Sequence, residues 1–350
     1  ELSPTIDDGS QYFNTVLYTG NGGTNAVTGV GFKPDWIWVK ERSSTSGHRL
    51  ADTTRGATKS LTSNDTGSET TNANIFSSLD SDGFTHGADN GVNESGQTYA
   101  SWNWKANGGT TSSNTDGSIT STVQANTTAG FSIVTYTGTG ASATVGHGLG
   151  KTPSVLIIKK RSSGGSARGW AVWNKSLSSA YADNLLRLDT NDAVGNNSVY
   201  WGGGNHTSTT FELNTSTLNN ENTYDFVAYC FAEIEGYSKF GSYTGNGSAD
   251  GTFVYTGFRP AFTLIKRTDA TQAWVLHDSA RAGYINPTDN YVYANATNVE
   301  AEDIDHDFLS NGFKIRATFN DTNASGGTYI YMAFAEHPFV TSGAVPVTAR

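Results

Sequence analysis

A short motif recurs three times along this chain and limits the folds that it can adopt. Tyr-Thr-Gly is followed two residues later by a second glycine, and the copies begin at Tyr18, Tyr136 and Tyr243. The spacings are 118 and 107 residues, which is too long for a solenoid unit and close to the size of a small domain. The sequence therefore predicts that one compact module has been triplicated.

The copies stay in step beyond this motif. In each of them an apolar run lies between a proline and a lysine six residues later: Pro34 and Lys40, Pro153 and Lys159, Pro260 and Lys266. The run is apolar at successive positions, which indicates a strand buried on both faces. We expect a central strand with one face in a sandwich core and the other against a neighbouring copy or chain. The proline can stand at the start of such a strand because it need not donate to the ladder there.

A second shared block holds an acid and an arginine three residues apart. The pairs are Asp52 with Arg55 in the first copy and Asp278 with Arg281 in the third, and the second copy has Asn174 and Leu177 at these places. An acid beside an arginine could serve catalysis, but a catalytic pair is seldom copied into several repeats. We therefore interpret the pairs as local ion pairs at a turn.

Each copy closes with an aromatic strand. A glutamate follows that strand in the second and third copies, as Glu233 and Glu336. Because these glutamates recur together with Lys159 and Lys266, we expect a lysine–glutamate pair in each of the two copies.

Short runs rich in Thr, Tyr, Val, Ile and Phe alternate with Asn, Asp and Gly throughout the chain, as is typical of sandwiches and barrels. We predict an all-β fold of three tandem β-sandwich, jelly-roll-like domains of about 100 residues each. Helical spacing of leucines and a tyrosine also predicts one short helix around 176–188. The expected parts are repeat 1 at 1–107, a linker at 108–130, repeat 2 at 131–235, repeat 3 at 236–338 and a tail at 339–350.

Composition excludes several classes of protein. The net charge of −10 argues against a nucleic-acid surface, which would be basic. No stretch approaches the roughly 20 apolar residues of a membrane span, so we expect no membrane insertion. Cys230 is the only cysteine, which excludes an intrachain disulfide. Aromatic residues make up 12% of the chain. Because disordered chains lack aromatic residues, we expect a folded protein.

No catalytic motif occurs: the sequence has neither Gly-x-Ser-x-Gly nor His-Glu-x-x-His. We therefore expect a protein that is not an enzyme and needs no cofactor. Calcium is the one ion that the pattern suggests, because acidic side chains alternate at Asp80 and Asp82 and again at Asp303 and Asp305. Neither place completes an EF-hand loop, and a solvated acidic turn is the alternative.

Tryptophan is the best pointer to a ligand, because its flat apolar ring with a polar edge suits sugars. Of the eight tryptophans, Trp36, Trp38 and Trp104 align with apolar residues of the other copies and are expected in the core. Trp201 lies instead in an unrepeated loop that also contains His206, and unrepeated exposed aromatics favour binding. We take Trp201, His206 and Trp170 as candidate contacts for a glycan.

Three signatures resemble a tandem domain of bacteriophage proteins, especially those of marine and cyanobacterial phages. They are the stretches 137–150, 237–245 and 330–336, and the likeness extends over about residues 12–338. The resemblance implies a virion structural protein: a tail fibre, a receptor-binding appendage or a capsid surface protein. It implies no catalytic residue.

These observations lead to one hypothesis with three alternatives. The chain is expected to be a non-enzymatic protein of the virion surface that forms a homo-oligomer, with a trimer as the first choice, and contacts other virion proteins or a host glycan. The alternatives are a carbohydrate-binding adhesin, a polysaccharide depolymerase and a self-assembling sheath or filament subunit. A depolymerase would need two carboxylates flanking a groove, and the recurring acids offer no obvious pair.

Overall fold

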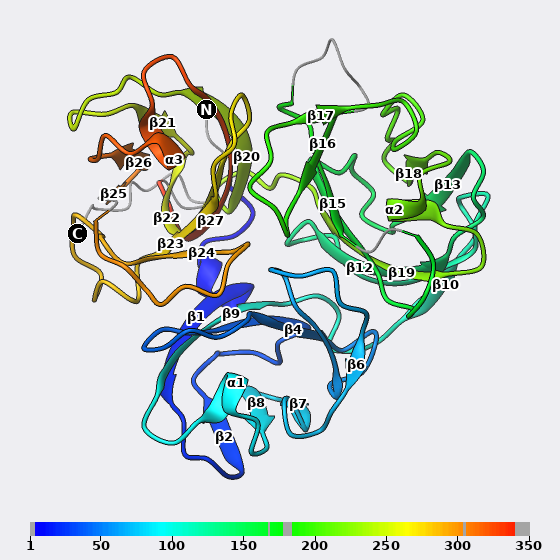
Figure 1. Cartoon of the computed structure of the whole chain (residues 1–350), viewed down its shortest axis with the longest axis horizontal. Helices are drawn as coiled ribbons and strands as arrows, with labels where there is room; N and C mark the ends of the chain where they lie inside the picture. Colours follow the sequence, from blue (N-terminus) through cyan, green and yellow to red (C-terminus); the bar gives the residue numbers. More distant parts are fainter. Residues whose placement is uncertain (1–3, 167–168, 178–183, 304–305, 340–350) are drawn as a thin grey trace.

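The protein has an all-β fold in which three lobes surround a common centre (Figure 1). The computed structural model describes residues 4–166, 169–177, 184–303 and 306–339. Each lobe is one repeat and consists of a large antiparallel sheet with a small antiparallel sheet on its outer side. This is the sandwich class that the sequence predicts. The helices within these described ranges are all too short or too polar to cross a lipid bilayer.

Repeat 1 combines a six-stranded and a three-stranded sheet. The large sheet has the order β1 (Phe13–Thr19), β9 (Thr98–Trp104), β3 (Trp36–Glu41), β4 (Arg49–Asp52), β5 (Lys59–Leu61) and β6 (Thr70–Thr71). The small sheet has the order β2 (Asn25–Thr28), β8 (Gly83–His86) and β7 (Ser78–Asp80). The single-turn helices η1 (Gly9–Gln11) and α1 (Asn90–Asn93) precede β1 and β9. Ile37 and Val39 of β3 share a core with the small sheet.

Repeat 2 has the sheet with the most strands, and its structure corrects two expectations. Its order is β10 (Ser112–Asn114), β11 (Ser121–Asn126), β12 (Phe131–Thr137), β19 (Asp225–Phe231), β14 (Val155–Lys160), β15 (Trp170–Asn174), β16 (Asn184–Arg187) and β17 (Gly195–Asn196). β13 (Ala143–Gly146) pairs with β18 (Thr210–Leu213), and helix α2 (Thr217–Asn220) precedes β19. The stretch 108–130 is therefore not a plain linker, because β11 pairs with β12. The helix expected around 176–188 is wrong at 184–187, which form a strand, and 178–183 lie outside the described residues.

Repeat 3 has a five-stranded and a three-stranded sheet. The large sheet has the order β20 (Ser238–Thr244), β27 (Thr328–Pro338), β22 (Phe258–Arg267), β23 (Trp274–Asp278) and β24 (Tyr291–Tyr293), and the small one β21 (Phe253–Tyr255), β26 (Gly312–Ile315) and β25 (His306–Leu309). Helix α3 (Asn320–Asn323) precedes β27. Pro34 and Pro153 precede their strands, whereas Pro260 lies inside β22 where the register shifts. A bulge tolerates proline because the ladder is interrupted there.

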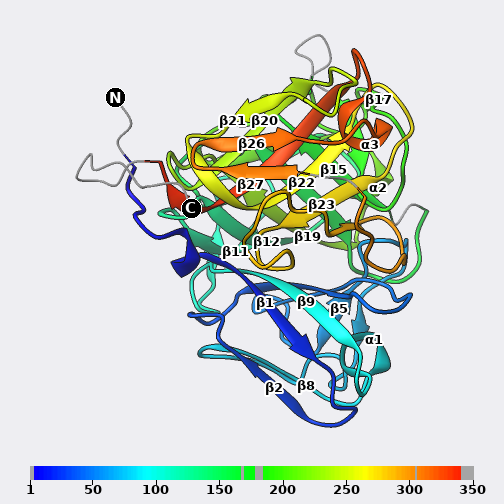
Figure 2. The same ribbon diagram turned by 90° about the vertical axis from the view of Figure 1, so that its left-hand side faces the viewer.

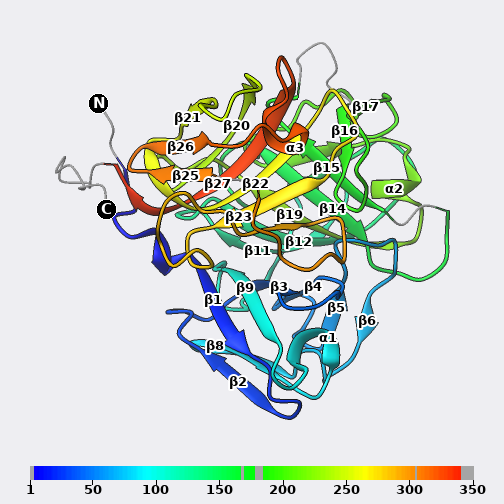
Figure 3. The same cartoon turned by 60° about the vertical axis from the view of Figure 1, so that its left-hand side comes forward.

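The inner faces of the three large sheets form one shared core. Figure 2 and Figure 3 show the sheet of repeat 1, in blue and cyan, beneath the sheets of repeats 2 and 3. One cluster holds the inward side chains of all three central strands: Trp36 and Trp38 of β3, Val155 and Ile157 of β14, Phe262 and Leu264 of β22. Trp36 stacks on Tyr229 of repeat 2 with ring centroids 4.3 Å apart, and Trp104 meets Phe262 of repeat 3 at 5.6 Å. The second apolar face of each central strand is thus covered by the other repeats of the same chain.

The Tyr-Thr-Gly motif joins the first strand of each repeat to the turn before its last strand. The tyrosine hydroxyl donates to a backbone carbonyl in that turn: Tyr18 to Val92 at 2.8 Å, Tyr136 to Asn219 at 2.6 Å and Tyr243 to Thr322 at 2.7 Å. The motif glycine passes so close to the turn that a Cβ atom would meet a carbonyl oxygen: 2.2 Å for Gly20, 2.4 Å for Gly138 and 2.4 Å for Gly245. The motif recurs because this close approach admits only glycine.

A buried asparagine completes the same turn, and our reading of the sequence missed it. Its carboxamide oxygen accepts from the backbone N–H after the motif glycine: Asn93 from Asn21 at 2.9 Å, Asn220 from Thr139 at 2.8 Å and Asn323 from Asn246 at 2.9 Å. In every copy this asparagine stands six residues before the first aromatic residue of the last strand. That spacing was the available signal.

Because the inner faces share one core, damage on one face should weaken the whole chain. We expect Trp36→Ala to lower the free energy of unfolding by about 3–5 kcal/mol, the usual cost of truncating a buried aromatic ring. Urea unfolding followed by circular dichroism should give a single transition at a lower midpoint. Phe253→Ala, at a side chain that is 44% exposed, is the control. A Trp36→Ala chain with one early and one unchanged transition would contradict a shared core.

Candidate functional site

The residues proposed to contact a ligand are engaged in packing. Trp201 is fully buried and its Nε1 donates to the carbonyl of Asn184 at 3.0 Å, because the unrepeated loop folds over the outer core of repeat 2. Trp170 is also buried, and its Nε1 donates to the carbonyl of Thr62 at 2.9 Å. The ring of His206 meets Trp173 edge-on at 4.3 Å. Burial and then the nearby His147 lower the pKa of His206 to about 3. The expectation of an exposed Trp201 is therefore wrong.

The proposed calcium residues have protein partners where the structure describes them. Asp82 accepts from the backbone N–H groups of Gly29 and Gly31 at 3.1 and 2.6 Å. Asp80 accepts from the Thr85 hydroxyl at 2.7 Å. Asp303 is exposed and lies beside the Tyr291 hydroxyl, and Asp305 lies outside the described residues. Within the described ranges, no three His, Cys, Asp or Glu side chains gather as a metal site would require.

The recurring residues meet at the three boundaries between repeats, which we call seams 1–2, 2–3 and 3–1. At each seam a buried ring donates to a backbone carbonyl of the preceding repeat: Trp170 to Thr62 at 2.9 Å, Trp274 to Arg187 at 2.9 Å and His48 to Tyr293 at 3.0 Å. Trp38 donates to the other nitrogen of His48 at 2.7 Å, and burial lowers the pKa of His48 to about 3. A neutral His48 can therefore donate from Nε2 and accept at Nδ1.

Seam 1–2 is held by a buried network of charges. Arg55 forms an ion pair with Asp52, and both side chains are fully buried. Tyr229 of repeat 2 donates to Asp52 at 2.8 Å. Glu69 joins the repeats, because its carboxylate accepts from Arg55 and from Arg161 of repeat 2, each at 2.9 Å.

Seam 3–1 repeats this network with equivalent residues. Asp278 and Arg281 form the buried ion pair, at 2.5 Å. Trp102 of repeat 1 takes the place of the tyrosine and donates to Asp278 at 2.9 Å. Glu300 pairs with Arg281 at 2.9 Å and with Arg42 of repeat 1 at 2.8 Å. The acid–arginine pairs thus hold a turn and also bind the next repeat.

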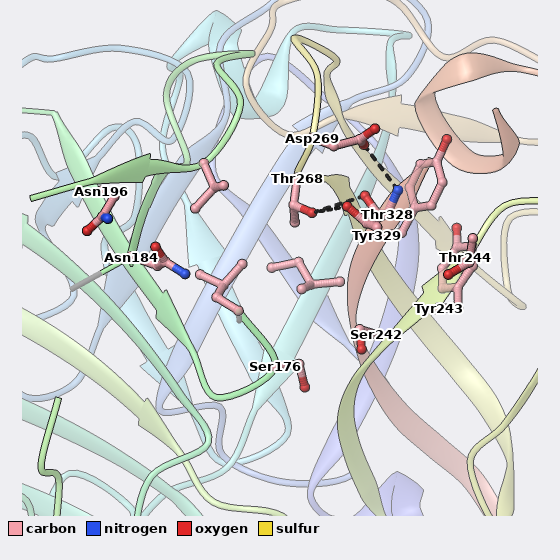
Figure 4. A pocket seen from close by; sticks show the side chains of 13 residues that line it. Ser176, Asn184, Asn196, Ser242, Tyr243, Thr244, Thr268, Asp269, Thr328 and Tyr329 are labelled. Carbon is pink, nitrogen blue, oxygen red and sulfur yellow. Dashed lines mark hydrogen bonds between the residues drawn. The ribbon is translucent and has the colours of Figure 1, made fainter. Parts of the chain in front are cut away.

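Seam 2–3 keeps the backbone geometry and lacks these charges. Val194 donates its N–H to the carbonyl of Thr268 at 2.9 Å, as Glu69 does to Arg161 and Glu300 to Arg42. The strand registers and this bond identify the equivalent positions at seam 2–3. Asn174 and Leu177 replace the acid and the arginine of the buried pair. Val194 replaces the bridging glutamate, Thr268 replaces its second arginine, and Met332 replaces the aromatic donor. A pocket of about 570 Å³ lies at this seam (Figure 4).

The recurring lysines Lys40, Lys159 and Lys266 are buried near the seams. Lys266 donates to the carbonyls of Gln272 and of Asn191 in repeat 2, at 2.6 and 3.1 Å. Burial lowers the pKa of Lys40 and of Lys266 to about 8. The expected lysine–glutamate pairs are wrong: Glu233 pairs with Lys175 at 2.5 Å, and Glu336 with Arg259 at 2.8 Å.

The fold and the seams define a class: a single chain of three fused β-sandwich repeats, closed around a common core like the subunits of a trimer. The chain belongs to the family described as a domain of unknown function, DUF7483, whose model matches residues 8–338. One family model therefore spans all three repeats. No curated protein and no solved structure matches the chain.

The charge network at seam 1–2 should make stability depend on pH. Burial alone would raise the pKa of Glu69, but Arg161 and Arg55 lower it from 4.5 to about 2. Because the folded pKa lies below the unfolded one, the carboxylate stabilises the fold above about pH 4.5 and loses this effect as the pH falls towards 2. Glu69→Gln should cost about 1–3 kcal/mol at pH 7 and reduce the fall in stability below pH 4.5.

Thermal unfolding of both chains between pH 7 and pH 3 would measure this effect. Asp250→Asn is the control, because it removes an exposed paired carboxylate whose loss should change little. If the Glu69→Gln chain and the unchanged chain lost equal stability with acid, the stabilising role of the Glu69 carboxylate would be contradicted.

The substitutions at seam 2–3 should be tolerated only together. Arg55→Leu leaves Asp52 buried without its partner and should cost about 3–5 kcal/mol. The double variant Asp52→Asn, Arg55→Leu reproduces the Asn174 and Leu177 of repeat 2 and should be more stable than the single variant. Urea unfolding of the two single variants and the double variant gives the coupling free energy between Asp52 and Arg55. A double variant less stable than Arg55→Leu would contradict this prediction.

Proposed function

We propose that this chain is a non-enzymatic structural protein of a bacteriophage particle, a tail fibre, appendage or capsid surface protein that serves assembly or contact with the host. The observation that carries the proposal is the use of the recurring charged residues, which hold the repeats together. Asp52, Arg55 and Glu69 and their equivalents in repeat 3 are engaged in ion pairs that stabilise the packing of the repeats. The assignment to a phage particle rests on the three sequence signatures that resemble phage virion proteins.

The buried reactive groups support a role without catalysis. Cys230 is fully buried, and burial raises the pKa of its thiol, which opposes formation of the nucleophilic thiolate. Burial likewise lowers the pKa of His48 to about 3 and of His86 and His147 to about 4. Neutral imidazoles in packed surroundings are poor candidates for general acids or bases near neutral pH.

A homotrimer remains part of the proposal, but it needs a surface outside the shared core. The doubly apolar strands that suggested a trimer are covered within one chain. Among the described residues, six of the seven exposed large apolar side chains lie in repeat 3: Phe253, Tyr255, Tyr284, Ile285, Val299 and Phe319. We therefore assign contacts with a further copy or with other virion proteins to repeat 3, which exposes most of these side chains.

Mass spectrometry of purified virus particles tests the proposal. Particles from cultures that express the gene should contain the chain in many copies, and an antibody against it should decorate their surface in electron microscopy. Recovery of the chain from cells or medium and not from particles would overturn the assignment. Filaments formed by the pure protein would favour the sheath alternative instead.

Glycan binding is the second candidate function, and the pocket at seam 2–3 is the observation that favours it. The proposed contacts Trp201 and Trp170 cannot supply it, because both are buried.

A further inference from the structure

Seam 2–3 is the place where the chain departs furthest from its own symmetry. The other two seams place glutamate–arginine pairs at the equivalent positions. At seam 2–3 Val194 and Thr268 occupy those positions, and both line the pocket of about 570 Å³. This volume lies within the range of sites for small molecules.

Polar groups of two repeats face each other across this pocket (Figure 4). Asn184 and Asn196 lie on the side of repeat 2, and Ser242, Thr268 and Thr328 on the side of repeat 3. Asn196, Ser242, Thr244 and Thr328 are exposed, so the rim is open to solvent. The remaining lining includes the apolar side chains of Leu177, Val194, Tyr243 and Ile330. The pocket therefore combines hydroxyl and amide groups with apolar side chains.

The charges at the pocket disfavour an anion. Among its described lining residues there is no lysine or arginine, and Asp269 is the one charged residue. The Asp269 carboxylate pairs with Arg267 at 2.9 Å and accepts from the backbone N–H of Thr328 at 3.1 Å. Because Arg267 is engaged with Asp269, the described lining offers an anionic ligand no cation with which to pair. A neutral ligand with many hydroxyl groups meets no such penalty.

We propose that the pocket at seam 2–3 binds a neutral saccharide of one to a few units. Hydroxyl groups of the sugar would bond to the amide and hydroxyl groups of the rim, and its apolar face would cover Leu177, Val194 and Ile330. Such mixed lining, apolar with a few placed polar groups, is the usual character of small-molecule sites. The binding is a property of this chain alone, so it does not rest on the proposed location in a phage particle.

Two variants block the pocket in different ways. The double variant Val194→Glu, Thr268→Arg installs the glutamate–arginine pair that occupies seams 1–2 and 3–1. Ser242→Trp places a large ring at the exposed rim. Leu17→Trp is the matched control, because Leu17 precedes the motif tyrosine of repeat 1 as Ser242 does in repeat 3 and is 39% exposed.

The test is titration calorimetry and saturation-transfer NMR of the purified chain. The probes are glucose, galactose, mannose and N-acetylglucosamine with their di- and trisaccharides, and sulfated and sialylated forms of the same sugars. We expect a neutral sugar to bind, no gain from added negative charge, and binding at least about tenfold weaker, or about 1.4 kcal/mol, in both blocking variants. Leu17→Trp should bind like the unchanged chain.

Three results would overturn the proposal. They are absence of binding across the whole panel, a requirement for a charged sugar, and binding that survives in both blocking variants. Circular dichroism melting of each variant shows whether it is folded, and Ser242→Trp keeps the test decisive if the double variant misfolds. A chain absent from virus particles would leave these binding results unaffected, so the two proposals fail separately.

Discussion

Burial of the inner faces of the three large sheets is the constraint on which the rest of the structure depends. A single repeat would leave Trp36 and Trp38, or their equivalents, in water on the face away from its small sheet. A unit of about 100 residues buries a modest fraction of its surface and is correspondingly marginal in stability. Closing three units around one centre removes all three faces from water at once. The repeats are therefore parts of one folding unit with a common core, although each has its own outer sheet.

Closure around a centre then fixes what the seams can contain. Each seam brings the start of β4, β15 or β23 against the carbonyls of the preceding repeat. The ring donors His48, Trp170 and Trp274 lie at these starts and satisfy the same requirement three times. The acid–arginine pairs are more demanding, because a buried charge is costly unless its partners are complete. Tyr229 and Glu69 complete the set for Asp52 and Arg55. Such a network is retained whole or replaced whole, and seam 2–3 has replaced it whole.

The sequence predicted the features that depend on periodicity and failed where distant segments meet. The period, the strand class and the doubly buried runs follow from local patterns such as Trp36–Lys40. The contact of Tyr229 with Asp52 joins residues 177 apart, and alternation identifies a buried face but not what covers it. The unrepeated loop around Trp201 predicts an exposed ring, yet a loop found in one repeat can still close that repeat's core. The polar composition of 108–130 predicts a linker, but edge strands such as β10 share that composition.

Fusion of the repeats in one chain permits what a trimer of identical chains could not have. In a symmetric homotrimer each substitution appears at every interface, so a pocket opened at one seam would open at all three and remove every charge network. Here seams 1–2 and 3–1 keep their networks while seam 2–3 has lost its own. Substitutions at seam 2–3 can therefore accumulate without altering the charge networks of seams 1–2 and 3–1. Comparison of three equivalent positions within one chain thus separates residues that maintain the charge networks from those released from them, such as Val194 and Thr268 at seam 2–3.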